Sequence, residues 1–355
     1  MRALTKIRLG TRGSELARTQ SEMVAQSLRE QGLEVELQIV KTHGDESASS
    51  LAQLGGVGVF AAALRCALLD GSCDIAVHSF KDLPTAPVPG LSIAAVPSGV
   101  ASHDVLCARD GLTLASLPAG ATVGTGSPRR AAQIRTLRPD LRLVDIRGNI
   151  GTRLARVKGH SRIVPGDLDA VVLAYAGLDR LGITDAITEH LTILPAAAQG
   201  RLAVECRNTD APWNSESELA QALANLDDPH ARFAAVAERA VLEGLQAGCA
   251  APVGVHCDDS SLRTAVFSSD GHKHVSVTLP LPAISDLATI VERDTAAREF
   301  GLRAASSLLQ QGAADITDLQ ASKTRGMDGV HDAELLWRPG ISGPNDDGAD
   351  VSVHD

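Results

Sequence analysis

The chain has 355 residues, enough for two or three domains that each bury a core, and a formal net charge of -10. Aromatic residues make up only 2% of the chain, too few for the base-stacking surfaces of a single-stranded nucleic-acid binder, and no segment approaches the roughly 20 apolar residues of a membrane span. Because no N-terminal stretch has the form of a signal peptide, the sequence predicts a cytoplasmic protein with neither nucleic-acid nor membrane partners.

Alternating strand and helix patterns open the chain. Residues 6–10 predict a strand and residues 14–30 an amphipathic helix, with Arg12 in the turn between them. Open α/β sheets bind ligands at such strand ends, although a structural turn arginine is the plainer alternative. A second strand is expected at 34–41. The polar, Gly- and Ser-rich residues 42–58 then form a connection long enough to predict a lid.

The stretch from 73 to 84 places charged residues just after a buried strand. Residues 75–77 are apolar, and the chain becomes polar from His78 onward. Lys81 and Asp82 therefore lie just past the carboxyl end of the expected strand, where functional residues gather in open α/β sheets. The alternative is an ordinary surface turn, and His78 is expected to be a structural histidine.

A second α/β unit is expected from about 104 to 194. Its strands are predicted near 104–108, 122–124, 143–146 and 170–174, and its helices start at Pro128, near Gly151 and around Gly177. This alternation predicts a mainly parallel sheet. Residues 194–200 are expected to form a hinge. The strand at 202–206 would return to the first domain, so that the chain crosses twice between two lobes.

A basic segment interrupts this acidic chain, because residues 124–158 contain eight Arg and one Lys against two Asp. Arginine binds planar carboxylates and phosphates through paired hydrogen bonds, so the segment predicts an anion site. Ser127 is placed to cap a helix that begins at Pro128, which puts Arg129 and Arg130 in its first turn. A solvated basic face is the alternative.

The remainder of the chain predicts a third, α+β domain and a tail. An Ala-rich helix is expected at 228–245, followed by short strands and a closing helix at 295–310. Residues 321–355 are rich in Gly, Asp and Pro and are expected to form a disordered acidic tail. The six cysteines show no C-x-x-C spacing, so neither a zinc site nor a disulfide framework is indicated. Cys249 lies in a Gly-containing turn and could by itself be an incidental thiol.

Several separated stretches resemble one family. They are, in chain order, IRLGTRGSELARTQ, THGDES, GGVGVFAAAL, DIAVHSFKDLPT, GTGSPRRAAQIR, RGNIGTRL, LAYAGLDRLG, LPAAAQGRLAVECR and AERAVLEGLQAGCAAPVG. Each motif alone is weak, but nine of them in order from about residue 6 to 256 form a specific pattern. Together they resemble hydroxymethylbilane synthase (porphobilinogen deaminase).

The resemblance implies an α/β fold of two similar lobes, like those of type II periplasmic binding proteins, with a cleft between them and a small α+β third domain. The expected domain 1 comprises 1–98 and 200–222. Domain 2 is expected at 102–195 and domain 3 at 227–320, ahead of the tail.

The resemblance also implies an enzyme of tetrapyrrole, and hence heme, biosynthesis. Such an enzyme deaminates porphobilinogen, adds four units head to tail to a thioether-linked dipyrromethane cofactor, and releases hydroxymethylbilane and ammonia. By motif matching, Cys249 is the attachment residue and Asp82 the catalytic carboxylate. The residues expected to bind cofactor and substrate are Arg12, Ser79, Lys81, Thr125, Ser127, Arg129, Arg130, Arg147, Arg153, Arg180 and Gln199. No metal is expected, and a monomer is the default.

This implied chemistry accounts for the basic segment. Every pyrrole ring carries two carboxylates, so the arginines would hold a polyanion through charge-assisted hydrogen bonds of ~1.5–3 kcal/mol each. Loss of ammonia leaves an azafulvene-like cation, which a carboxylate can stabilise while it assists proton transfer. One departure from the family is Val57, which stands in the lid where many members have Lys.

Two other classes of function stay open from the sequence. A non-catalytic, two-lobed binding protein for small carboxylated ligands would need neither Asp82 nor Cys249. A nucleic-acid binder could use the basic segment, but the net charge of -10 and the scarcity of aromatic residues argue against it.

Overall fold

The computed structural model describes residues 6–40, 58–161, 166–248, 250–283 and 289–320. Nearly all of the expected lid, including Val57, lies outside the described residues, as do Cys249 and the expected tail at 321–355. The chain divides into two units, Met1–Lys323 and Thr324–Asp355, and all described residues belong to the first.

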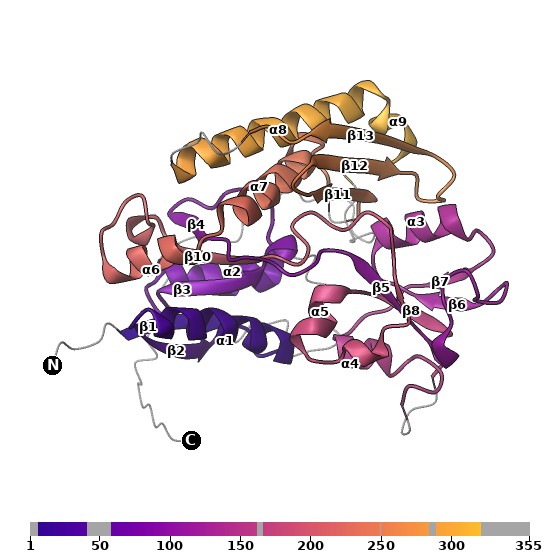
Figure 1. Ribbon diagram of the computed structural model, residues 1–355, viewed down its shortest axis with the longest axis horizontal. Coiled ribbons are helices and arrows are strands. Elements are labelled where there is room, and N and C mark those ends of the chain that lie inside the picture. The colour runs from indigo at the N-terminus through magenta and orange to yellow at the C-terminus, as the bar shows by residue number, and fades with distance from the viewer. Residues whose placement is uncertain (1–5, 41–57, 162–165, 249, 284–288, 321–355) are drawn as a thin grey trace, which may run out of the picture. The chain divides into compact units, whose positions relative to one another are not determined.

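The first sheet is built mainly from the N-terminal part of the chain (Figure 1). Its strand order is β2-β1-β3-β10-β4, in which β1 is parallel to β2 and β3, while β10 is antiparallel to β3 and β4. Its elements are β1 (Lys6–Thr11), α1 (Glu15–Glu30), β2 (Glu34–Ile39), α2 (Gly58–Leu69), β3 (Ile75–Ser79), η1 (Phe80–Asp82), β4 (Leu91–Ala95), β10 (Leu202–Arg207), η4 (Asn208–Asp210) and α6 (Glu218–Leu226). Aliphatic side chains from α1, α6 and the strands form its core.

The second sheet is built from the middle of the chain. Its strand order is β7-β6-β8-β5-β9, in which β6 is parallel to β7 and β8, while β5 is antiparallel to β8 and β9. Its elements are β5 (Asp104–Ala108), η2 (Arg109–Gly111), β6 (Thr122–Gly124), α3 (Pro128–Leu137), β7 (Arg142–Val144), α4 (Ile150–Leu154), β8 (Ala170–Ala174), α5 (Tyr175–Arg180), η3 (Thr184–Ala186) and β9 (Glu189–His190). Separate apolar clusters cover the sheet, one around Val123 and one around Val171.

The two five-stranded sheets have equivalent topologies. In each sheet the fourth strand is antiparallel to its neighbours, and it is the strand that directly follows a crossing of the chain between the lobes. β5 enters the second sheet directly after β4 ends the first, and β10 returns to the first sheet after β9. The chain therefore passes between the lobes twice, over 96–103 and 191–201. This arrangement confirms the predicted pair of similar α/β lobes and the return of the strand at 202–206, while the three domain boundaries stay predictions.

A third, smaller sheet follows, with the antiparallel order β11-β12-β13. Its elements are α7 (Pro229–Gly244), β11 (Val253–Cys257), β12 (Ser261–Phe267), β13 (His274–Pro280), α8 (Ile290–Gln310) and α9 (Ala313–Ile316). α7 lies between α8 and the first sheet (Figure 1). The two helices approach closely because Gly301 lacks a side chain: a Cβ there would lie 2.1 Å from the Ala237 carbonyl oxygen.

Several features differ from the prediction. The second sheet is mixed rather than mainly parallel, because β5 runs antiparallel to β8 and β9. α8 begins at Ile290 rather than near 295, because Thr289 and Glu292 form a reciprocal capping box ahead of the apolar stripe. β7 ends at Val144, and the apolar Ile146, predicted as strand, instead packs into the core after the strand has ended. α6 is not among the predicted elements.

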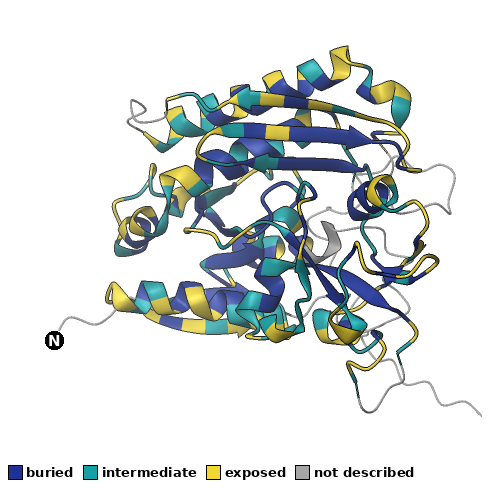
Figure 2. Cartoon of the chain, turned by 45° about the vertical axis from the view of Figure 1, so that its right-hand side comes forward, coloured by how far each residue is buried: buried dark blue, intermediate teal, exposed yellow. Residues whose placement is uncertain are grey.

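Burial follows these elements, since the inner strands β3, β5, β8 and β10 carry mostly buried residues, while the edge strands β2, β7, β9 and β13 and the outer helix faces are more exposed (Figure 2). No helix in the described part of the chain is both long enough and apolar enough to cross a membrane.

Candidate active site

Lys81 and Asp82 lie in the short 3-10 helix η1, directly after β3. β3 is the central strand of the first sheet and its first four residues are buried, so its carboxyl end brings η1 to the edge of the sheet. Phe80 N–H donates to the Arg201 carbonyl oxygen (3.0 Å), and Leu83 N–H donates to the Phe80 carbonyl oxygen (3.2 Å). The backbone of this turn is thus fixed against β10, while the Asp82 side chain is exposed.

The Lys81 ammonium reaches a residue between the lobes. Its Nζ donates to Oε1 of Gln199 (3.3 Å), and Gln199 Nε2 donates to Oδ1 of Asp104 (2.8 Å). Burial, opposed by Asp82 but reinforced by Arg130, lowers the pKa of Lys81 to about 8. An ammonium in such surroundings is stabilised by an added anion.

Asp104, at the start of β5, is the centre of a buried ion cluster. Its Oδ1 accepts bonds from Nη2 (2.7 Å) and Nε (3.1 Å) of Arg130, and its Oδ2 lies 2.8 Å from Nη1 of Arg129. Burial alone would raise the pKa of Asp104, but the two guanidiniums outweigh it and hold the pKa well below its usual range. Asp104, Arg129, Arg130, Gln199 and Lys81 together are here named the Asp104 cluster.

Local signals at the start of α3 position the arginine pair, as predicted. Ser127 caps the helix by accepting the Arg130 N–H (3.5 Å), and Pro128 occupies the first turn. Thr125 Oγ1 accepts the Ser127 N–H (3.2 Å) and shapes the turn ahead of the cap. Arg129 and Arg130 are both buried, and each donates to a backbone carbonyl oxygen in addition to its pairing with the Asp104 carboxylate.

Arg147 precedes the short helix α4 and Arg153 lies within its last turn, and both side chains are more open than those of Arg129 and Arg130. Arg153 Nε donates to the Gly148 carbonyl oxygen (2.8 Å). Burial, together with the nearby Arg130 and Arg147, lowers the pKa of Arg153, while Asp82 is among the charges that oppose this shift. The Arg147 side chain is 65% exposed and lies 3.2 Å from an equally exposed Asp145 carboxylate. These cations of the second lobe therefore act electrostatically on the same region as Asp82.

The other predicted site residues lie in several surroundings. Arg12 directly follows β1 and lies two residues before Ser14, the N-cap residue of α1. Ser79 ends β3, and its hydroxyl lies 2.9 Å from Nε2 of Gln20 on α1. Arg180 ends α5, where its Nη2 donates to the Gly200 carbonyl oxygen (2.7 Å) and burial lowers its pKa. Cys249, the expected attachment residue, lies outside the described residues.

Asp104 is absent from the predicted site residues, although it organises them. The available signal is an acid at the head of the apolar run DVLCA, which forms β5. A buried carboxylate requires cationic partners, and the arginine-rich segment that follows could supply them. The pairing of Asp104 with these arginines depends on the packing of β5 beside β8 and α3. The sequence alone does not predict this packing.

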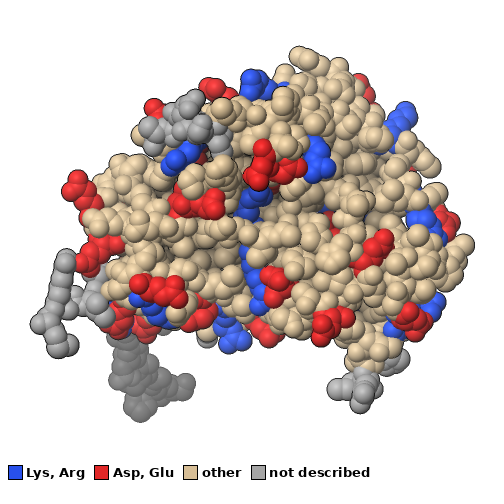
Figure 3. Space-filling model, viewed as in Figure 1, with Lys and Arg blue, Asp and Glu red and all other residues tan. Residues whose placement is uncertain are grey.

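Charged side chains gather at the surface near these elements. On the face shown in Figure 3, Lys and Arg side chains reach the surface near the middle of the view, with acidic side chains around them. Among the described residues, no three His, Cys, Asp or Glu side chains are grouped as a metal ion would require. The described part of the site can therefore bind anions and offer one free carboxylate.

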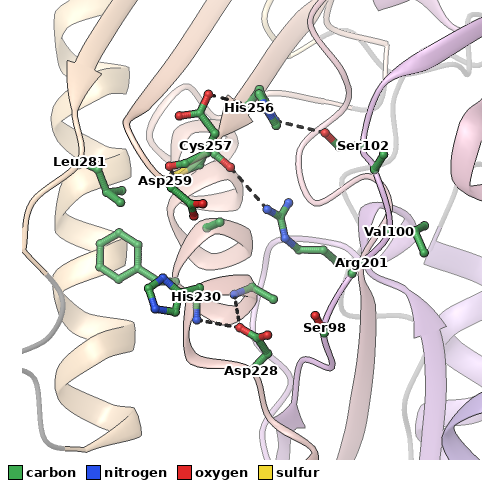
Figure 4. Close-up of a pocket in the computed structure, with 16 residues that line it drawn as sticks. Ser98, Val100, Ser102, Arg201, Asp228, His230, His256, Cys257, Asp259 and Leu281 are labelled. Atoms are coloured by element: carbon green, nitrogen blue, oxygen red, sulfur yellow. Dashed lines mark hydrogen bonds and ion pairs between the residues drawn. The ribbon is translucent and has the colours of Figure 1, made fainter. Parts of the chain in front are cut away.

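A pocket of about 360 Å³ lies beside the crossings (Figure 4). The crossing at 98–102, Arg201 and the third domain line it, and Ser102 Oγ lies 3.2 Å from Nδ1 of His256 across its wall. None of the predicted site residues lines this pocket. The pocket lies between the crossings and the third domain, and neither Lys81 nor Asp82 lines it.

Two family models and several known proteins are similar to this chain. The chain matches the family model "Porphobilinogen deaminase, dipyromethane cofactor binding domain" over residues 7–215 and "Porphobilinogen deaminase, C-terminal domain" over 233–310. It is 53% identical to a porphobilinogen deaminase of Cutibacterium acnes, over 90% of this chain and 99% of the relative. It is 51% identical to that of Leifsonia xyli, over 88% and 95% of the two chains. A solved periplasmic substrate-binding protein from Coxiella burnetii is similar at 16% identity and a TM-score of 0.38, over 64% of this chain and 95% of that one.

Nearly the whole described chain thus matches one family, and the matched segments include the turn of Lys81 and Asp82, the α3 arginines and the hinge glutamine. This chain belongs to the porphobilinogen deaminase family.

Proposed function

We propose that the chain is a transferase of tetrapyrrole biosynthesis, which deaminates porphobilinogen and joins four units head to tail on a covalent dipyrromethane. Each unit added releases one ammonia, and water then cleaves the four-unit chain from the dipyrromethane as hydroxymethylbilane. Membership of the family supports this reaction. The observation that carries the proposal in this chain is the shared turn of Lys81 and Asp82. One turn presents an exposed carboxylate next to an ammonium that Gln199 holds from the hinge.

Cations around this turn are assigned to the substrate carboxylates. Porphobilinogen and each added ring bring two carboxylates, which require N–H donors with free capacity. Within the described residues, Arg153 uses only its Nε in a hydrogen bond, and the pair of Arg147 with Asp145 is exposed and readily exchanged. A bound carboxylate would offset the burial, and the repulsion from neighbouring arginines, that lower the pKa values of Arg153 and Lys81. Arg147, Arg153 and Lys81 are therefore assigned to substrate binding.

The residues present also fit an anionic dipyrromethane. Arg180 Nε is buried and has no hydrogen-bond partner among the described residues, so its N–H can donate to an acidic ligand group. The proposed contacts are Arg12, Ser79, Thr125, Ser127, Arg129, Arg130, Arg180 and Gln199. When bound, the dipyrromethane supplies the pyrrole carbon to which the first porphobilinogen is joined.

Cys249 is proposed as the attachment residue. Burial raises the pKa of the Cys73 thiol to about 11, and that of Cys107, Cys206 and Cys257 to about 12, so these four are poor thiolates at neutral pH. The raised pKa values of these four buried thiols agree with attachment at another cysteine.

Asp82 is proposed to act on the reacting ring. Departure of ammonia leaves positive charge on the substrate, and a carboxylate at hydrogen-bond distance from the pyrrole N–H groups stabilises that charge. The same carboxylate can receive the proton that the attacked ring carbon loses when the new carbon–carbon bond forms. The exposure of Asp82 leaves it free for both tasks.

We further propose that the enzyme works as a monomer in the cytoplasm. All five described cysteines are free thiols, which agrees with a reducing compartment.

Incubation of the purified chain with porphobilinogen tests the proposal. The expected result is release of ammonia and a bilane that cyclises to a uroporphyrin on standing. Binding of porphobilinogen without turnover would favour a non-catalytic binding protein instead.

Intact-mass measurement tests the attachment separately. The wild-type mass should exceed the sequence mass by one dipyrromethane, and Cys249→Ser should lack the adduct. An adduct that persists in Cys249→Ser would move the attachment to another residue.

A further inference from the structure

A single guanidinium from the third domain holds the turn that carries Lys81 and Asp82. Arg239 lies on α7, and its Nη1 donates to the carbonyl oxygens of Phe80 (3.2 Å) and Leu83 (2.8 Å). Its Nη2 donates to the carbonyl oxygen of Pro84 (2.6 Å). The guanidinium carbon also lies 4.7 Å from the centre of the Phe80 ring, within range of a cation–π interaction.

These contacts bracket the two candidate functional residues. Phe80 precedes Lys81, and Leu83 follows Asp82, so one planar group fixes both ends of η1. Arginine suits this task because its donors are arranged in a rigid fork, which a lysine lacks. The bonds come from 155 to 159 residues away in sequence, and they add to the backbone bonds that Phe80 and Leu83 already make at this turn.

Arg239 keeps its charge in this partly buried position. Burial and the nearby Arg65 lower its pKa to about 10, against the pull of Glu205 and Glu243. At neutral pH the guanidinium is therefore still protonated, and three carbonyl oxygens solvate it in place of water.

The preceding residue on α7 holds the hinge. The buried Glu238 carboxylate accepts the N–H groups of Ala198 (2.6 Å) and Cys257 (2.8 Å) and lies 3.2 Å from Nη1 of Arg201. Neighbouring residues of α7 thus bind two different segments, the hinge and the η1 turn. The chain leaves the end of α7 at Gly244 and reaches Cys249 five residues later.

We propose that Arg239 is a positioning residue for the reaction, which sets the orientation of Lys81 and Asp82 from the third domain without touching the substrate. The proposal rests on the function proposed above. It assigns to α7 a second task besides preceding Cys249 in the sequence: through Arg239, α7 holds the η1 turn in place.

Kinetics of Arg239→Met form the first test. We expect kcat to fall at least 10-fold while KM changes less than threefold, because small displacements of a catalytic group reduce rate more than binding. Arg303→Met is the matched control. The guanidinium carbon of Arg303 lies 5.5 Å from the centre of the Phe300 ring, as that of Arg239 lies over Phe80, but Arg303 does not contact η1. Its kcat should stay within twofold of wild type.

A conservative variant guards against loss of folding. Arg239→Lys keeps the charge but can reach only one or two of the three carbonyl oxygens that Arg239 contacts. We therefore expect a folded protein whose kcat lies between those of wild type and Arg239→Met. Wild-type kcat in both Arg239 variants, with their folds intact, would overturn the proposal. If Arg239→Met does not fold, the same decision rests on Arg239→Lys, for which a kcat at least threefold below wild type is expected.

A readout independent of turnover is the titration of Lys81. The chain has six lysines, so reductive methylation with 13C-formaldehyde yields few NMR signals, and Lys81→Arg identifies the one that belongs to Lys81. In wild type this signal should titrate near pH 8, and in Arg239→Met it should move at least one unit toward an ordinary lysine value. An unchanged titration in Arg239→Met would contradict the proposal.

The two readouts separate failure of the positioning role from failure of the proposed function. If the wild-type chain forms no bilane, the proposed function fails, while the Lys81 titration still tests whether Arg239 positions the turn. If wild type forms bilane but the titration and kcat are both insensitive to Arg239, only the positioning role fails.

Discussion

Lys81 and Asp82 are neighbours in one short turn, yet their surroundings are opposite. A 3-10 helix has three residues per turn, so successive side chains project about 120° apart. Asp82 consequently remains exposed, while Lys81 enters the Asp104 cluster and donates to Gln199. This divergence allows a single turn to offer a free carboxylate for chemistry beside a cation that is fixed for binding.

Asp82→Asn should lose at least ~100-fold in turnover while the fold and the attached cofactor are retained. Asparagine preserves the polarity of the side chain but supplies neither negative charge nor a proton acceptor of comparable strength. Single-turnover rates with porphobilinogen, together with circular dichroism and intact mass, would measure this.

Asp110→Asn is the matched control for that substitution. Asp110 is an exposed aspartate of η2, the 3-10 turn that follows β5, and it pairs with the neighbouring Arg109 (2.6 Å) rather than with the site. Turnover of this variant should equal that of wild type. Near-normal turnover of Asp82→Asn would remove Asp82 from its proposed role.

The pKa of Lys81, about 8 instead of 10.5, predicts opposite effects of pH on binding and on stability. Above pH 8 the ammonium loses its proton, so kcat/KM for porphobilinogen should decline. Over the same range the unfolded state binds more protons than the folded state. The contribution of Lys81 to stability therefore rises as the pH is raised from 8 to 10.5. The same contribution is lost as the pH falls through 8.

A pH profile of kcat/KM in wild type and Lys81→Arg measures the binding effect. Arginine stays charged over this range, so the decline near pH 8 should be absent or displaced upward in the variant. Identical profiles for the two proteins would show that another group controls the decline.

At the scale of elements, the two crossings of the chain meet at a strained contact. Gly200 has a φ of 85°, and its carbonyl oxygen accepts bonds from the Val100 N–H (3.3 Å) and from Nη2 of Arg180 (2.7 Å). Ala198 has a φ of 57°, which is unfavourable for an alanine, and its N–H donates to Glu238. The hinge conformation is therefore imposed by contacts with the second lobe and the third domain.

Gly200→Ala should destabilise the protein much more than Gly182→Ala. Both glycines have left-handed φ values, 85° and 67°, which cost an alanine about 1–2 kcal/mol. At Gly182 a Cβ would meet nothing within 4 Å, whereas at Gly200 it would lie 2.4 Å from the Val100 carbonyl oxygen and force the crossings apart. Urea unfolding of the two variants measures the difference, and equal losses would show that the crossings can separate freely.

At the scale of the whole described chain, ion pairs between distant segments join the three sheets. The Asp104 cluster links the first sheet to the second through Gln199. The third domain is tied in by Arg232, whose side chain is only 1% exposed and which pairs with Asp227 and Asp294 and donates to the carbonyl oxygens of Ile93 and Ala94 on β4. Buried charges of this kind specify one arrangement, because a displaced partner leaves an uncompensated charge.

Asp104→Asn should lower the free energy of unfolding by about 3–5 kcal/mol, since it leaves Arg129 and Arg130 buried without their counter-ion. Asp167→Asn, which removes an exposed partner of Arg156, should leave the unfolding midpoint nearly unchanged. Denaturant titrations at neutral pH compare the two. A small effect of Asp104→Asn would mean that water or Gln199 compensates the arginines.

The predicted site residues differ in how far their placement followed from the sequence. The Ser127-Pro128 start of α3 and the turn after β3 were predictable, because caps and strand ends depend on neighbouring residues. The buried state of Arg129 and Arg130 was not, because burial depends on Asp104, at least 25 residues away and on another element. A count of charges over 124–158 does not distinguish a cation that faces a ligand from one that neutralises an interior acid.

By itself, the sequence determined the family, the order of the predicted elements and the local turns. It also identified the charged and reactive side chains, because all of these depend on residue types and short spacings. Only the tertiary structure decided that Asp104 neutralises the arginine pair and that Arg239 holds the turn of Asp82. The physical reason is the same in each case. These contacts join segments dozens to more than a hundred residues apart, and their energies depend on burial, which exists only once the sheets have packed.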